Sequence, residues 1–217
     1  MTDLGDRFPA ILEQAAAGDQ DAFALLWSAT HPMLVRYLRV MCAGQAEDVA
    51  SETWLKAIRA LGSFHGDEQG FRGWLVVIAR NVVRDLARHQ ARRPETLSGD
   101  LPPDYVDREA LRLVGPEPDV ADVALERLST RAALRLVAGL PPAQAEMVAL
   151  RVVIGLDVAE VAAIVGRSPG AVRVAVHRGL RTLADQLADQ LAPALETGPE
   201  DASVTQEQAK ALSNRDV

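Results

Sequence analysis

The sequence predicts an all-α protein made of two small helical domains. Apolar residues recur at spacings of three and four over residues 7–93 and again over residues 123–191, which is the period of amphipathic helices. Alternating apolar and polar residues, the pattern of a half-buried strand, never continue for more than a few positions. A proline-rich, acidic stretch separates the two regions, so we expect domains at residues 1–93 and 123–192 joined by a flexible acidic linker at 94–122.

Composition favours a cytoplasmic protein that is not an enzyme. The one cysteine, Cys42, excludes an internal disulfide and fits a reducing compartment. No apolar run approaches the length of a membrane span, and residues 1–10 lack the basic and apolar parts of a signal peptide. None of the four histidines lies at metal-site spacing from Cys42, and there is no nucleophile elbow or phosphate loop, so we expect no metal and no cofactor. The polar stretch 193–217 is expected to be a disordered tail.

The net charge of −7 conceals two basic segments. Residues 72–93 hold six arginines and one acid, and residues 167–184 hold four arginines and no acid. The acids are concentrated between them, where residues 94–126 hold nine acids and two arginines, and in the C-terminal stretch. Two basic helices separated by acidic connectors indicate local binding of a polyanion.

Three helices are expected before the first basic one. They read FPAILEQAAA, AFALLWSATHPMLVRYLRVMC and DVASETWLKAIRAL, with breaks at Gly18-Asp19 and at GSFHGDEQG (62–70). The apolar stripe of the third helix consists of Ala50, Trp54, Ala57 and Leu61. On its exposed side, Glu52 has an ordinary helical ion-pair partner in Lys56, whereas Asp48 has none nearby in the sequence. We therefore hypothesise that Asp48 meets a basic protein surface.

The next helix, FRGWLVVIARNVVRDLARHQARR (71–93), carries a ladder of arginines. The residues expected to be buried are Leu75, Ile78, Val82 and Leu86, and the arginines at every fourth position are Arg80, Arg84, Arg88 and Arg92. Only Asp85 interrupts the positive field, so a polyanion is the economical partner. Phe64, His65, Phe71 and Trp74 lie beside the ladder. They suit stacking on unpaired bases, and a place in the core is the alternative for Phe71 and Trp74.

In the second domain, breaks are expected at GLPPA (139–143) and VIGLD (153–157). A helix-turn-helix is predicted from Asp157 onward, in the stretch DVAEVAAIVGRSPGAVRVAVHRGLRTL. Asp157 and Glu160 have the spacing of a capping box, so a short helix should begin at Val158. Gly166 should end it, and Ser168 followed by proline has the pattern of an N-cap with proline in the first helical position. The result is helix, three-residue turn, helix.

The second helix of this motif has an apolar face and a cationic face. The residues expected to face the core are Val172, Val176, Leu180, Leu183 and Leu187. Arg173, His177 and Arg181 step by four on another face, with Arg178 beside them. Like charges one turn apart are mildly unfavourable unless an anion meets them. The small residues Gly170 and Ala171 at the start of the helix leave room to enter a major groove.

Three segments in this order resemble the short, two-domain extracytoplasmic-function sigma factors of bacterial RNA polymerase. AEDVASETWLKAIRALGSF is similar to their core-polymerase-binding segment, and FRGWLVVIARNVVRDLARHQARR to the segment that opens and reads the −10 promoter element. LPPAQAEMVALRVVIGLDVAEVAAIVGRSPGAVRVAVHRGLRTL is similar to their −35-reading domain. The resemblance covers about residues 8–93 and 123–190.

The resemblance implies a role for each matched position. Asp48 and Glu52 would meet the basic clamp helices of core RNA polymerase. The loop Gly62–Gly70 would hold a flipped non-template base. The residues expected to contact promoter DNA are Arg80, Asn81, Arg84 and Arg88 at the −10 element, and Ser168, Ala171, Arg173, Val174, His177 and Arg178 at the −35 element. The family often has a polar or basic residue after the position of Arg173, where this chain has Val174 and Ala175.

The resemblance also implies that the acidic linker threads through the polymerase near the RNA exit path, and that an anti-sigma factor is a partner. Two other functions fit part of the sequence. A stand-alone helix-turn-helix repressor or activator would explain residues 157–183 but not the arginine ladder or Asp48. A helical protein-interaction module without DNA would behave independently of salt on heparin.

Overall fold

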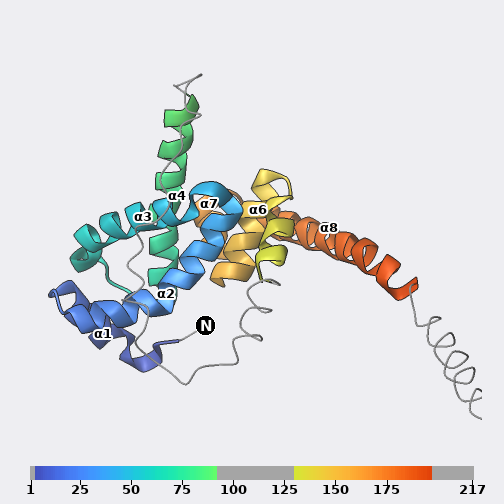
Figure 1. The fold of residues 1–217 in the computed structure, drawn as a ribbon. Helices are drawn as coiled ribbons and strands as arrows, with labels where there is room; N and C mark the ends of the chain where they lie inside the picture. The colour runs from blue at the N-terminus through green and yellow to red at the C-terminus, as the bar shows by residue number, and fades with distance from the viewer. Residues whose placement is uncertain (1–2, 92–129, 197–217) are drawn as a thin grey trace, which may run out of the picture. The chain divides into compact units, whose positions relative to one another are not determined.

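The computed structural model describes residues 3–91 and 130–196, and every regular element in these two ranges is helical, which confirms the predicted fold class (Figure 1). The N-terminal range contains η1 (Gly5–Arg7), α1 (Phe8–Ala16), α2 (Gln20–Met41), η2 (Ala43–Gln45), α3 (Ala46–Ala60), η3 (Leu61–Ser63) and α4 (Glu68–Ala91). The C-terminal range contains a helix at 130–138, α6 (Pro142–Val148), the π-helical segment η4 (Ala149–Ile154), α7 (Val158–Val165) and α8 (Pro169–Glu196). The predicted linker at 94–122 and the chain from 197 onward lie outside the described residues. None of the helices described here combines the length and the apolar character that crossing a membrane requires.

The N-terminal helices pack in sequence, α1 on α2, α2 on α3 and α3 on α4. The predicted break at Gly18-Asp19 is present: Gly18 has a φ of +96°, and the Asp19 carboxylate caps α2 by accepting a hydrogen bond from the Ala22 N–H at 2.8 Å. The fully buried side chains between these helices include Phe8, Leu26, Leu34, Tyr37, Leu38, Phe71 and Leu75. Burial of these large apolar groups is what holds the short helices together.

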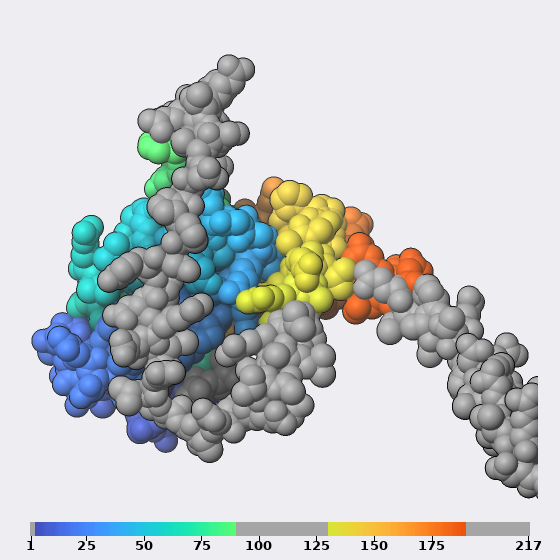
Figure 2. All heavy atoms as spheres, viewed as in Figure 1, coloured from blue at the N-terminus to red at the C-terminus, as the bar shows by residue number. Residues whose placement is uncertain are grey.

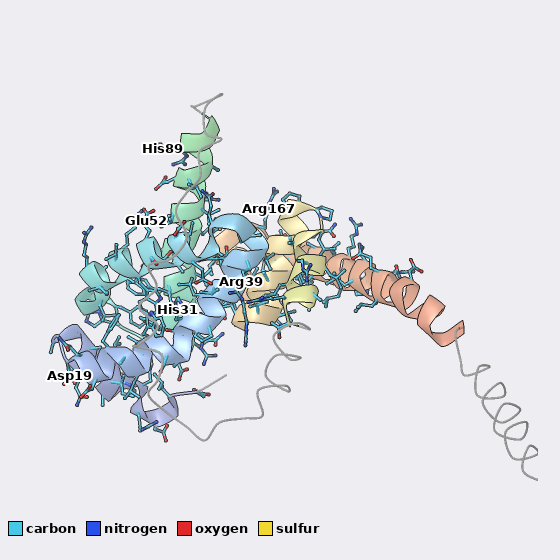
Figure 3. The ribbon with its side chains drawn as sticks, viewed as in Figure 1. Asp19, His31, Arg39, Glu52, His89 and Arg167 are labelled. Atoms are coloured by element: carbon cyan, nitrogen blue, oxygen red, sulfur yellow. The ribbon has the colours of Figure 1, made fainter. Side chains whose placement is uncertain are left out.

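The predicted apolar stripe of α3 is confirmed, since Ala50, Trp54, Ala57 and Leu61 are all buried. The indole Nε1 of Trp54 donates a hydrogen bond to Nδ1 of His31 at 3.3 Å. His31 lies on α2 and is labelled in Figure 3. Burial lowers the pKa of His31, which favours the neutral ring that accepting a hydrogen bond at Nδ1 requires. This pair ties α3 to α2.

The expected stripe of α4 is partly wrong. Leu75 and Val82 are buried as expected, but Ile78 and Leu86 are only half-buried, and Val76 and Ala79 take their places in the core. The reason is that α4 packs against α3, α2 and α7, so its buried surface is wider than one stripe and turned from the expected one.

The C-terminal helices are separated at the two predicted breaks. Pro141 precedes α6, and Gly155 ends η4 with a φ of +85°, a left-handed conformation that favours glycine. Arg151 donates a hydrogen bond to the carbonyl oxygen of Leu156, which closes the turn between η4 and α7. The core here is built from Leu150, Ile154, Leu156, Val161 and Val172, all with no exposed surface.

The expected core face of α8 needs a correction. Val172 is buried and Val176 and Leu183 are half-buried, but Leu180 and Leu187 are 44% and 46% exposed. Gly179 is the buried residue instead, because a Cβ at this position would lie 2.8 Å from Cγ2 of Val148. The buried face therefore steps 172, 176, 179, 183, and Leu180 is turned about 100° away from it.

The chain divides into one compact unit that ends at Gly179 and a second that begins at Leu180. Within the first unit, α2 packs against α6 and η4, and α4 packs against α7. Figure 2 shows the atoms that follow residue 130 directly beside those of α2. Helix α7 and the part of α8 up to Gly179 thus belong to the same compact unit as the N-terminal helices.

Candidate nucleic-acid and polymerase interface

The predicted helix-turn-helix is confirmed in its local details. The Asp157 carboxylate accepts a hydrogen bond from the Glu160 N–H at 2.8 Å, and the Glu160 carboxylate accepts one from the Asp157 N–H at 2.6 Å, which makes the capping box complete. Gly166 ends α7 with a φ of +69°. The Ser168 hydroxyl then caps α8 by accepting from the Ala171 N–H at 3.2 Å. Three residues separate the two helices.

The start of α8 presents an exposed, acid-free surface. The exposed residues there are Ser168, Gly170, Ala171, Arg173, Val174, His177, Arg178 and Arg181. Val172 between them is fully buried and anchors the helix on the rest of the motif. Half of the Val174 side chain is exposed, so an apolar contact lies between the cationic ones. Such a surface can offer hydrogen bonds to phosphates and base edges and an apolar contact to a thymine methyl group.

The arginine ladder of α4 is divided by burial. Asn81, Arg84 and Arg88 are exposed, and Arg88 forms an exposed ion pair with Asp85 at 3.1 Å. Exposed pairs of this kind contribute little, so Arg88 can exchange its partner for a phosphate. Arg80 differs from the others because its side chain is only 14% exposed. Arg92, the last position of the predicted ladder, lies outside the described residues.

Arg80 is held by the C-terminal helices. Its Nε donates to Oε1 of Glu146 at 2.5 Å, its NH2 to Oε2 of the same carboxylate at 3.3 Å, and its NH1 to the carbonyl oxygen of Ile164 at 2.8 Å. The hydrogen bonds to Glu146 raise the pKa of Arg80. Glu146 was not singled out from the sequence, because its partner lies 66 positions away and leaves no local signal.

The aromatic residues beside α4 pack on one another. Phe64 and Phe71 have ring centroids 5.4 Å apart, and Trp74 lies 5.3 Å from Phe64 and 5.4 Å from Phe71. Phe71 is fully buried and Trp74 half-buried, so Phe71 takes the core alternative. Asp67 caps α4 by accepting from the Gly70 N–H at 2.8 Å. The loop before α4 is thus held by the packing of Phe64 and by the Asp67 cap, which is a suitable frame for a base-binding loop.

The acidic face of α3 keeps one carboxylate without a partner. Glu52 forms the expected ion pair with Lys56 at 2.8 Å, and Glu47 pairs with Arg39 of α2 at 3.0 Å. Asp48 is exposed and has no ion-pair partner within the described residues. Leu55, on the same side of the helix, is 57% exposed. Leu55 was not among the residues predicted for this surface, although its position seven residues after Asp48 and outside the buried stripe indicates an exposed side chain.

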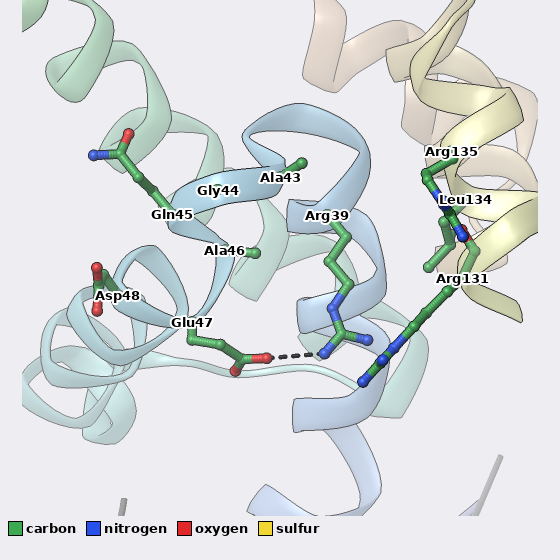
Figure 4. Close-up of a pocket in the computed structure, with 10 residues that line it drawn as sticks. All are labelled: Arg39, Ala43, Gly44, Gln45, Ala46, Glu47, Asp48, Arg131, Leu134 and Arg135. Carbon is green, nitrogen blue, oxygen red and sulfur yellow. Dashed lines mark hydrogen bonds and ion pairs between the residues drawn. The ribbon is translucent and has the colours of Figure 1, made fainter. Parts of the chain in front are cut away.

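Asp48 also lines an open cleft of about 670 Å³ (Figure 4). One wall carries Arg39, Glu47 and Asp48, and the other is the helix at 130–138 with Arg131, Leu134 and Arg135. The dashed line in Figure 4 marks the Arg39–Glu47 pair, which belongs to the first wall. Among the described residues no group of histidine, cysteine and carboxylate side chains could hold a metal ion.

An exposed acidic helix, an arginine-bearing helix and a helix-turn-helix in one helical chain are typical of a DNA-binding protein with a further surface suited to another protein. The sigma-70 region 2 family matches residues 26–93, and the family described as sigma-70, region 4 matches residues 130–183. Over 186 residues the chain is 39% identical to the ECF RNA polymerase sigma factor BldN of Streptomyces coelicolor, covering 84% of this chain and 67% of that protein. Over 193 residues it is 35% identical to the ECF RNA polymerase sigma factor SigD of Mycobacterium tuberculosis, covering 86% and 87%. The chain belongs to the extracytoplasmic-function (ECF) sigma factors of RNA polymerase, and it is an alternative sigma factor.

A solved structure shares the fold. CnrH, determined in complex with the cytosolic domain of CnrY, matches with a TM-score of 0.55 over 85% of this chain and 99% of that chain, at 24% identity. This likeness supports the helical fold described above.

Proposed function

We propose that this sigma factor recruits core RNA polymerase through the acidic face of α3, reads the −35 duplex with the first turns of α8 and binds the parting strands of the −10 element with α4. The observation that carries the proposal is Asp48, an exposed carboxylate without an ion-pair partner in the described residues. The other two carboxylates of the same helix, Glu47 and Glu52, both form ion pairs. A DNA-binding regulator acting alone has no need of such a surface.

The proposed polymerase-binding surface combines charge with apolar contact. Asp48, Glu52 and Leu55 are spaced by four and three residues, so they lie along one side of α3. Ile58, one turn further, is 48% exposed. Carboxylates steer the approach to a basic surface, and leucine and isoleucine supply the apolar area that stabilises a complex once it forms.

At the promoter, the two DNA-binding helices meet different states of DNA. Arg173, His177 and Arg178 with Val174 would contact closed duplex from a helix whose N-terminus is capped and free of acids. Asn81, Arg84 and Arg88 would follow the strands as they separate, beside the loop 62–70 that would hold an unpaired base. We assign these roles to domains at residues 1–93 and 123–192.

We further infer that the protein acts in the cytoplasm as a non-enzymatic initiation factor, with an anti-sigma factor as a further partner. The members of its family named above are RNA polymerase sigma factors, which supports a role in regulating transcription. CnrH was determined in complex with the cytosolic domain of CnrY. A pull-down of the tagged chain from its own host should recover polymerase subunits together with such a partner.

The test of polymerase binding reverses one charge. Asp48→Arg should abolish co-purification with core polymerase and leave the circular dichroism spectrum unchanged, because the side chain is exposed. Glu13→Arg makes the same charge change at an exposed position of α1 and should bind as the parent does. Unchanged binding by Asp48→Arg would remove α3 from the interface.

The stand-alone regulator is tested by a gel shift with promoter duplex. The proposal expects a specific shift only when core polymerase is present, since the polymerase supplies much of the DNA affinity. A specific complex of the chain alone, unaffected by polymerase, would favour the regulator.

A further inference from the structure

The loop 62–70 is held by the first residues of the chain at both of its ends. At its start, η3 packs against α1. At its end, Oε2 of Glu68 accepts hydrogen bonds from the N–H groups of Leu4 at 2.9 Å and Gly5 at 3.1 Å. These partners lie 64 and 63 positions away in the sequence, so the contact belongs to the tertiary structure and leaves no local pattern.

Glu68 is a buried carboxylate whose second oxygen is also occupied. Its side chain is 10% exposed, as is that of Arg72, whose NH2 donates to Oε1 of Glu68 at 2.5 Å. Backbone N–H groups together with a guanidinium supply the hydrogen bonds and the opposite charge that a buried carboxylate requires. A carboxylate enclosed in this way is not available to DNA, so we assign it to holding Leu4 and Gly5 on the start of α4.

Aromatic rings form a second connection between the loop and the N-terminal residues. Phe8, the first residue of α1, is 1% exposed, and its ring centroid lies 5.7 Å from that of Phe71. Phe71 in turn packs on Phe64, a ring within the loop. The loop backbone folds closely around that ring, because a Cβ on Gly66 would lie 3.0 Å and one on Gly70 3.8 Å from its Cζ. The position of the loop therefore depends on a row of rings that begins at Phe8.

The loop keeps exposed residues for a ligand, among them His65, Gly66 and Asp67. Nδ1 of His65 donates a hydrogen bond to the carbonyl oxygen of Ser63 at 3.0 Å, since a carbonyl oxygen can only accept. An aromatic ring fixed in this way can stack on an unpaired base. The N-terminal residues contact the buried side chains of the loop, so they support it without competing for the exposed ones.

We propose that Leu4, Gly5 and Phe8 form an N-terminal anchor that positions the loop 62–70 for the unpaired −10 base, with Glu68 as the positioning residue that joins the two. This inference rests on the proposed function for the base-binding role of the loop. A flexible loop loses conformational entropy when it closes on a ligand, so a loop already held in shape binds its base more tightly. The N-terminal anchor thus contributes to −10 recognition without contacting DNA.

Two substitutions break this contact from its two ends. Glu68→Gln removes the charge and leaves Arg72 and the two N–H groups with a weaker acceptor. Gly5→Pro removes one of the N–H donors and cannot adopt the φ of +52° found there, yet it leaves the Glu68–Arg72 pair in place. The controls are Glu13→Gln, the same charge change at an exposed position of α1, and Gly179→Ala, which disturbs packing in the C-terminal helices.

Hydrogen exchange in the free, full-length chain reports on the loop itself. The N–H groups of Phe64, Gly70 and Phe71 are hydrogen-bonded in the loop and at the start of α4. They should exchange about tenfold faster in Glu68→Gln and Gly5→Pro, because the loop opens locally more often. They should keep the parent rate in both controls. Unchanged protection of these groups in Gly5→Pro would overturn the N-terminal anchor.

Base binding is measured with the holoenzyme and a fluorescent single strand that the parent selects from a randomised pool. An abasic site is placed at each position in turn, and the captured base is the one whose removal weakens parent binding most, by about tenfold. Both anchor variants should reduce this loss to about threefold or less and bind the abasic strand as the parent does. The double variant should behave as the single ones do, because both break the same contact. The controls should keep the full loss.

A full loss retained by Glu68→Gln and Gly5→Pro would overturn the positioning role. Equal weakening on the intact and abasic strands would also overturn it, since that result indicates a general structural defect. A parent holoenzyme with no sensitive position would instead reject the proposed base-binding function of the loop. The hydrogen-exchange measurement needs neither polymerase nor DNA, so it decides the N-terminal anchor independently of that function.

Discussion

At Gly179, one missing side chain sets how α8 packs. Val148 and Leu140 come within 2.8 Å and 3.3 Å of where a Cβ would be, so the helix approaches α6 more closely than any other residue would allow. The leucine next to it in the sequence is exposed as a consequence. The regular apolar spacing predicted that Leu180 would be buried, because such a pattern is read from apolar side chains and a glycine has none.

We expect Gly179→Ala to lower the free energy of unfolding by about 1–3 kcal/mol, because the added methyl overlaps Val148. Gly170→Ala is the matched control on the same helix, with nothing within 4 Å of its Cβ position. It should be neutral or stabilising by up to about 1 kcal/mol, since alanine favours the helix. Urea unfolding measures both, and equal midpoints for the two variants would contradict the packing argument.

At the scale of whole elements, the helix ends were the most predictable features. The caps of α7 and α8 were predicted to the residue, because an N-cap side chain and the N–H that it satisfies are three positions apart in the sequence. The π-helical segment η4 was not predicted. The segment contains no glycine, proline or other turn residue that would indicate a change from α-helix. It packs against α2, a contact that the local sequence does not indicate.

The two basic helices should act at different steps of initiation. Arg173→Ala, at the start of α8, should weaken recruitment to a duplex that carries only the upstream element and leave a pre-melted −10 template usable. Arg84→Ala, in the exposed part of α4, should preserve capture and slow strand opening, as measured by permanganate reactivity of unpaired thymines. Base contacts by Arg173 should account for roughly 1–3 kcal/mol of discrimination.

If the two substitutions acted only by removing positive charge, both variants would show the same defects, and raising the salt concentration would produce these defects in the parent chain. Equal defects of the two variants on duplex and pre-melted templates would therefore reject this division of labour. Arg7→Ala removes the same charge at an exposed position of η1, outside both basic helices, and should leave both steps unchanged.

At the scale of the molecule, proteolysis separates the role of the predicted linker from that of the polar contacts between the N-terminal helices and α6 and α7. Protease should first cut the free chain within residues 94–122, as the proline-rich acidic sequence predicts. The two fragments of the parent should then stay together on a sizing column through the contacts of Arg80 and Gln69. The fragments of Glu146→Lys should separate. Protection of the linker in the free chain would contradict the prediction of a flexible tether.

The sequence alone determined the all-helical fold, the ends of the helix-turn-helix, the buried stripe of α3 and the exposed position of Asp48. All of these depend on neighbours within four residues, whose spacing along a helix is known in advance. Tertiary structure alone decided which arginine of the ladder is exposed and which is held in an ion pair with another helix. Arg84 and Arg80 are equivalent in the sequence, but only Arg80 meets Glu146, 66 positions away, when α6 packs on the N-terminal helices. A contact of that kind depends on how the helices come together, and no local period records it.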